Sequence, residues 1–78
     1  MDAREIFELL IKADEKLKYA TAETAAARRT QARDLLVRAR EEARAIGNDQ
    51  LVAQSEQRLA DLDLQEHPAS GEERSGGG

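Results

Sequence analysis

The chain has 78 residues, of which 36% are charged, and a formal net charge of −4 at pH 7. This length suits one small domain, and the acidic balance argues against a nucleic-acid or membrane-surface binder, which is normally basic. No apolar run approaches the roughly 18 residues of a membrane span. The N-terminal residues lack the basic, apolar and small-residue regions of a signal peptide. We therefore expect a cytoplasmic protein with no nucleic-acid or membrane partner. The abundant alanine and the excess of arginine over lysine are associated with bacterial genomes of high GC content.

The first predicted element is a helix over residues 3–20. Asp2 and Glu5 have the spacing of a capping box, in which each side chain accepts a hydrogen bond from the other residue's backbone amide. Phe7 and Ile11 lie at the edge of the apolar face of this helix. They either complete a three-helix core or form an exposed patch for a partner or a second copy. The apolar face itself has helical spacing and comprises Ile6, Leu9, Leu10, Ala13, Leu17 and Ala20.

The end of this first helix is weakly marked, because no glycine or proline occurs within residues 1–46. The break lies either at Thr21–Thr24 or at Arg28–Gln31, since threonine favours helix caps over helix interiors. We predict the turn at Thr21–Thr24. A single helix of about 44 residues would be unusual in a compact domain.

A second helix is predicted over residues 24–46, and Gly47 follows it as a left-handed stop. Asn48 or Asp49 then caps a third helix over residues 49–64. The connection between them is only about two or three residues long, so these helices must be antiparallel neighbours. The second helix presents Ala25, Ala32, Leu35, Leu36, Ala39, Ala43 and Ile46, and the third presents Leu51, Val52, Ser55, Leu59 and Leu62.

The composition changes abruptly at residues 65–78, which contain a proline, two serines and four glycines. This segment has little apolar surface to bury, so we predict a disordered tail. The predicted fold class is all-α: a small three-helix bundle over residues 1–64, with an antiparallel hairpin of the second and third helices, followed by the tail.

The residues that catalysis and metal binding require are scarce in this sequence. The single histidine, His67, lies beside Pro68 at the start of the predicted tail, where it is a poor base for a nucleophile. Zinc needs about four convergent ligands, and the chain has no cysteine. Every glycine except Gly47 lies in the predicted tail, so no phosphate-binding loop is present. We expect no enzymatic activity, no cofactor and no metal site.

Four arginines of the second helix share one side, at the rim of its apolar face, within about 60° on a helical wheel. One interpretation is a docking stripe for an acidic helix, since arginine offers fork-shaped donors. The other is pairing inside the bundle, with acids of the first and third helices such as Glu8, Glu15, Glu56 and Asp61. The stripe comprises Arg29, Arg33, Arg40 and Arg44.

Residues 32–62 resemble the tetratricopeptide repeat. Ala32, Leu36 and Ala39 have the spacing of the second helix of one repeat, and Leu59–Ala60 resembles the start of the next. Residues 43–49 also look like the turn between bacterial repeats of this kind. The length and the alanine pattern are in addition similar to the microtubule-interacting and trafficking domain. Both families bind peptide helices without doing chemistry, which is what the resemblance implies here.

The sequence thus favours a protein-interaction or adaptor module, with a protein partner contacted through Phe7, Ile11 and the four arginines of the stripe. Two alternatives stay open. One is a helical homo-oligomer, in the simplest case a homodimer, in which the first two helices form a long arm that pairs with a second copy. The other is a small regulator that sequesters a larger protein in the manner of an anti-sigma factor or an antitoxin.

Overall fold

The structure is a computed structural model that describes residues 1–66, and it consists of three helices in this range. α1 spans Ala3–Lys18, α2 spans Ala25–Ala45 and α3 spans Asp49–Glu66. The prediction of an all-α three-helix fold is confirmed. Of the predicted tail, only Gln65 and Glu66 are among the described residues. Residues 67–78, which include His67, lie outside them. Gln65 and Glu66 were wrongly assigned to the tail, because they form the last turn of α3.

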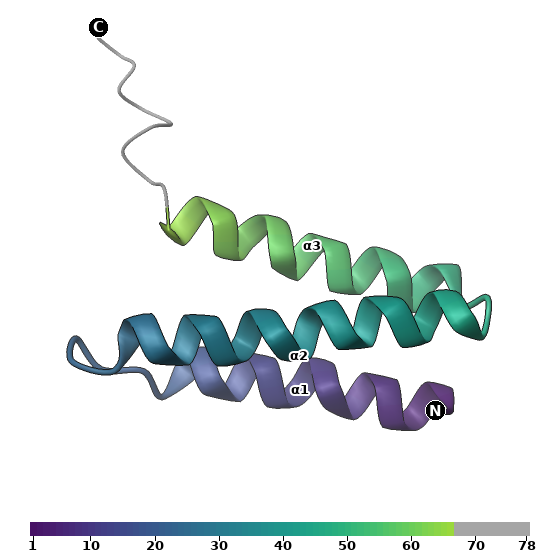
Figure 1. The fold of residues 1–78 in the computed structure, drawn as a ribbon, viewed down its shortest axis with the longest axis horizontal. Coiled ribbons are helices and arrows are strands. Elements are labelled where there is room, and N and C mark those ends of the chain that lie inside the picture. Colours follow the sequence, from purple (N-terminus) through teal and green to yellow (C-terminus); the bar gives the residue numbers. More distant parts are fainter. Residues whose placement is uncertain (67–78) are drawn as a thin grey trace, which may run out of the picture.

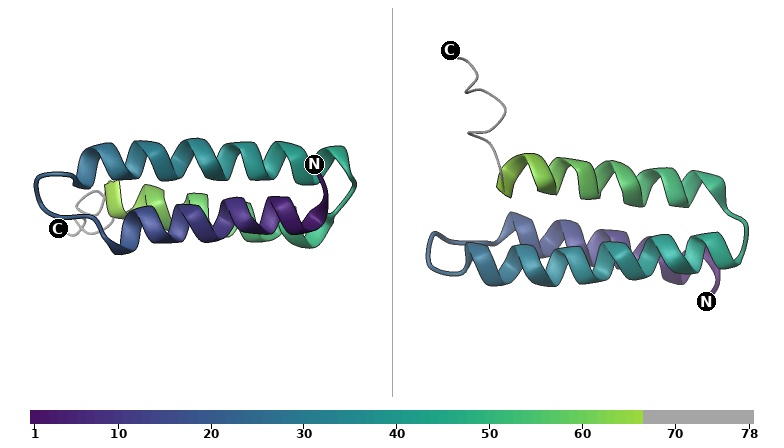
Figure 2. Two further views of the ribbon diagram at one scale, coloured as in Figure 1. Left: turned by 90° about the horizontal axis from the view of Figure 1, so that it is seen from below. Right: turned by 45° about the horizontal axis from the view of Figure 1, so that its top comes forward.

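The helices run antiparallel in chain order, with α2 between the other two (Figure 1). α1 packs against one side of α2 and α3 against another, whereas α1 and α3 contact each other at few positions. The two further views in Figure 2 show the same arrangement, with α1 and α3 both alongside α2. None of the described helices combines the length and the apolar character needed to cross a membrane.

The ends of the helices follow from local sequence. The capping box at α1 is confirmed: Glu5 N–H donates to Asp2 Oδ1 at 2.8 Å, and Asp2 N–H donates to Glu5 Oε1 at 3.0 Å. Reciprocal hydrogen bonds between Thr21 and Thr24, each from backbone N–H to the other's Oγ1, brace the turn before α2. This turn separates α1 from α2, so the two do not form one long arm.

The α2–α3 turn depends on Gly47, whose φ of 69° lies in the left-handed region that favours glycine. Gly47 N–H donates to the Arg44 carbonyl at 3.0 Å, and Asn48 N–H donates to the Ala43 carbonyl at 2.9 Å. This pair of bonds is a Schellman motif, which satisfies carbonyl groups at the end of α2. Asn48 Oδ1 then accepts from Leu51 N–H at 3.0 Å and caps α3. The predicted stop and cap are both confirmed.

The core is thin and rich in alanine where α2 contributes to it. Ser55 is the one polar residue buried with it among residues 1–66. Its hydroxyl donates to the Leu51 carbonyl at 2.8 Å, so the polar group is satisfied within its own helix. Ile46, which the sequence assigned to the apolar face of α2, is instead exposed beyond the last residue of that helix. The buried apolar residues are Ile6, Leu9, Leu10, Ala13, Ala32, Leu36, Ala39, Ala43, Leu51 and Leu62.

Candidate functional site

The arginine stripe of α2 lies along the boundary with α3, and three of its four members pair with acids of α3. Arg33 binds both Asp63, at 3.0 Å, and Glu66. Arg29 approaches Glu66 at 3.9 Å. These guanidinium groups therefore hold the last turns of α3 against α2, which explains why the helix continues through Glu66.

The other end of the stripe is also engaged. Arg44 bridges Glu56 of α3, at 3.1 Å, and Glu41 of its own helix, at 3.2 Å. Arg40 lies 3.3 Å from the same Glu41 carboxylate. The sequence suggested four acids as partners of the arginine stripe, and of these only Glu56 pairs with it. The main partners of the stripe, Asp63 and Glu66, were missed.

Replacing Arg33 tests how much these ion pairs contribute to the stability of the bundle. We expect Arg33→Gln to lower the free energy of unfolding by about 1 kcal/mol, because it removes two half-exposed ion pairs but keeps a helix-forming side chain. Added salt should reduce the difference. The measurement is urea denaturation followed by circular dichroism at two salt concentrations.

Arg38→Gln is the matched control, since Arg38 is exposed on α2 and in no ion pair among residues 1–66. It should change the free energy of unfolding by less than about 0.5 kcal/mol. Equal effects of the two substitutions would contradict a structural role for Arg33.

A different surface is left uncovered by the bundle. Phe7 is 44% exposed and Ile11 is 38% exposed, so they do not complete the core. They lie one helical turn apart on α1, at the edge of the face that carries its buried residues. Such i, i+4 residues are neighbours on a helix surface. Among residues 1–66 they are the only two large exposed apolar residues with this spacing.

Charged residues of α1 lie beside this apolar pair. A shallow hollow of about 370 Å³ lies over α1, lined by Phe7, Ile11 and three charged neighbours, and every lining residue belongs to α1. We use "outer face of α1" for this surface with one further residue from the first turn. It comprises Arg4, Phe7, Glu8, Ile11, Lys12 and Glu15.

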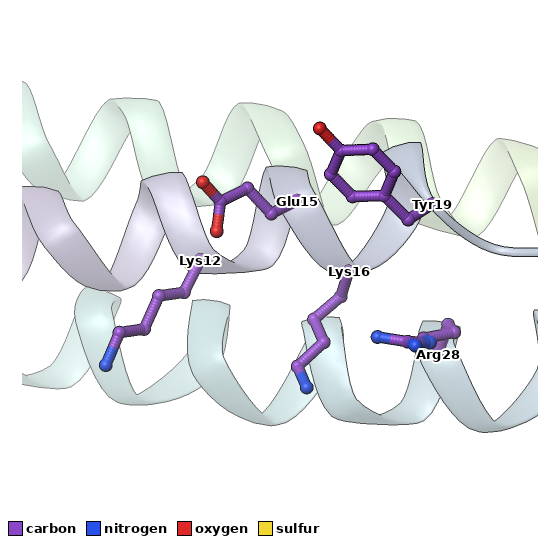
Figure 3. Close-up of a pocket in the computed structure, with 5 residues that line it drawn as sticks. All are labelled: Lys12, Glu15, Lys16, Tyr19 and Arg28. Atoms are coloured by element: carbon purple, nitrogen blue, oxygen red, sulfur yellow. The ribbon is translucent and has the colours of Figure 1, made fainter.

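A second hollow, of about 410 Å³, lies between the last turns of α1 and the first turns of α2. Figure 3 shows Lys12 and Lys16 extending from α1 towards α2, with Arg28 on the opposite helix, whereas Glu15 and Tyr19 point the other way. The three cations would attract an anion. Because Lys12 is exposed and Lys16 and Arg28 are only half-buried, that attraction is weak and falls with salt.

The described residues show no arrangement of metal ligands. In residues 1–66, aspartate and glutamate side chains nowhere gather in the group of three that could hold a metal ion.

Tyr19, whose place the sequence left open, is 65% exposed, with the Lys18 amine 5.5 Å from its ring centre. The outer face of α1 remains the candidate site that carries two exposed large apolar residues one turn apart.

Comparisons with protein-family models, with curated protein sequences and with solved structures find no match to this chain. The resemblance to tetratricopeptide repeats and to the microtubule-interacting and trafficking domain stays a prediction.

Proposed function

We propose that this chain is a non-enzymatic protein-interaction module that binds a helical partner along the outer face of α1. The observation that supports the proposal is the exposure of Phe7 and Ile11, side by side on a helix whose other large apolar residues are buried or half-buried. An amphipathic helix is recognised through apolar residues at such spacing, with charges at the border. The outer face of α1 offers both.

The free energy gained by burying the apolar pair limits the affinity of the complex. Burying the exposed parts of Phe7 and Ile11 gains roughly 1 kcal/mol for each residue. Association also costs several kcal/mol of translational and rotational freedom, so two such residues do not suffice for a tight complex. Complementary charges and a rigid, preformed helix must supply the rest. We therefore propose a transient contact with a partner that carries its own charges.

The arginine stripe of α2 is a weaker candidate for docking. Two of its arginines, Arg33 and Arg44, already use their terminal guanidinium nitrogens in ion pairs with Asp63, Glu66 and Glu56. A partner at the stripe would have to displace these carboxylates, so α3 would lose its ion pairs with α2. Binding at the outer face of α1 breaks no contact between helices.

Affinity capture with the full chain tests the proposal. The chain and the double variant Phe7→Gln/Ile11→Gln are immobilised and exposed to extract of the cells that produce it. We expect proteins retained by the native chain to be lost by the double variant, because it removes the exposed apolar pair without altering the core.

The matched control is Leu64→Gln, which removes an apolar residue that is 66% exposed on α3. It should retain the same proteins as the native chain. If the double variant and the native chain retain the same proteins, the binding surface lies elsewhere and the proposal is wrong.

A further inference from the structure

The charges on the outer face of α1 alternate in sign from one turn to the next. Arg4 lies in the first turn, Glu8 beside Phe7 in the second, Lys12 beside Ile11 in the third, and Glu15 in the fourth. The order is thus positive, negative, positive, negative, with the apolar pair in the two middle turns. Read from the fourth turn to the first, the same face therefore has the opposite charge at every position.

This property makes the face complementary to itself in one orientation. When two copies meet antiparallel, the first turn faces the fourth and the second faces the third. Arg4 then faces Glu15 of the other copy, and Glu8 faces Lys12 of the other copy. A parallel alignment would place each charged residue opposite the same residue of the other copy, and like charges repel. The four apolar side chains gather at the centre of the antiparallel pair.

The rest of the structure leaves this face free to pair. The neighbouring acid Asp14 is bound by Arg58 of α3 at 3.0 Å, whereas Glu15 is in no ion pair among residues 1–66. The Arg4 side chain is 89% exposed, and its Nε lies 3.9 Å from Oε2 of Glu8 on the same helix. The charges at both ends of the face are therefore available to a second copy.

We infer that the partner bound at the outer face of α1 is a second copy of this chain, paired antiparallel about a two-fold axis near the level of Leu9 and Leu10. The inference rests on the proposed function, which it deepens by naming the occupant. A two-fold interface repeats every contact twice, so each ion pair counts twice. A contact between single helices of this length is small, which places it among weak, transient interfaces.

Charge reversal tests the pairing without disturbing the helix. Arg4→Glu adds an acid to the first turn of α1 and Glu15→Arg adds a cation near its end, and both changes favour the helix dipole. Each single variant nevertheless places two like-charge contacts in the dimer. The double variant Arg4→Glu/Glu15→Arg restores opposite charges in reversed order.

The experiment is sedimentation equilibrium of the full chain at low salt, up to about 1 mM, a range that detects dissociation constants of weak complexes. The mass of the native chain should rise above 8.6 kDa towards twice that value. Each single variant should weaken the dimer by about fivefold or more, and the double variant should bind within about twofold of the native chain. Arg38→Glu, on the exposed side of α2, is the control and should leave the mass unchanged.

Two outcomes would overturn the inference. A native chain that stays monomeric over the whole range excludes self-pairing, while the proposed function is then decided by the capture experiment with Phe7→Gln/Ile11→Gln. A dimer whose stability is the same in the native chain and both single variants is not held by the outer face of α1 in the antiparallel orientation.

Discussion

Replacing Leu36 by alanine is expected to lower the free energy of unfolding by about 2–5 kcal/mol, as large-to-small core substitutions do. Leu36 is fully buried near the centre of α2, the helix that contacts both others. Its buried neighbours one turn away are alanines, Ala32 and Ala39, whose methyl groups are too short to fill the space left behind. Small domains have only a few kcal/mol of stability, so much of the population should unfold.

Urea denaturation followed by circular dichroism measures this effect. Leu64→Ala is the matched control, because it removes the same atoms from a largely exposed residue and should cost less than about 0.5 kcal/mol. A loss below about 1 kcal/mol for Leu36→Ala would contradict its place at the centre of the core.

The second large effect is expected from adding volume at Ala39. This residue is fully buried, and its short side chain is one of those that let the neighbouring helices approach α2 closely. Ala39→Leu should destabilise the chain by about 1–3 kcal/mol, because three extra carbon atoms force the helices apart or the side chain out of its preferred rotamer.

Ala60→Leu is the matched control. It makes the same change in helix propensity, which is nearly equal for alanine and leucine, without overpacking the core. Ala60 is exposed on α3, so the added side chain has room. Its free energy of unfolding should stay within about 0.5 kcal/mol of the native value. If thermal and urea unfolding show equal stability for both variants, α2 does not approach its neighbours as closely as described.

The features that sequence analysis predicted correctly depend on residues close together in the chain. The capping box of Asp2 and Glu5, the left-handed Gly47 and the cap at Asn48 each involve at most a few neighbouring residues. The turn at Thr21–Thr24 belongs to the same group. Hydrogen bonds over such short distances are specified by the local residue types, so their pattern is readable without the fold.

The features that were missed depend on contacts between distant residues. Glu66 is helical and pairs with Arg33, which lies 33 residues away in the chain. Composition alone placed Gln65 and Glu66 in the tail, because the change towards proline, glycine and serine begins close by. Ile46 was given to the core by its periodicity, but α2 ends at Ala45 and the residue turns outward.

The candidate site illustrates the same limit. The helical wheel showed that Phe7 and Ile11 widen the apolar face of α1, but it did not show how many neighbours that face has. The answer comes from the arrangement of the helices: α1 has one extensive neighbour, α2, and only a narrow contact with α3. Two residues that could have faced a third helix are left in solvent.

The position of α2 between its sequence neighbours also has a consequence for how fast the chain folds. Both extensive interfaces join helices that follow each other directly, α1 with α2 and α2 with α3. Bringing them together closes only the short turns between them, so little chain entropy is lost before contacts form. Proteins dominated by such local contacts fold in microseconds to milliseconds. During synthesis, α1 and α2 are able to pair before α3 has been made.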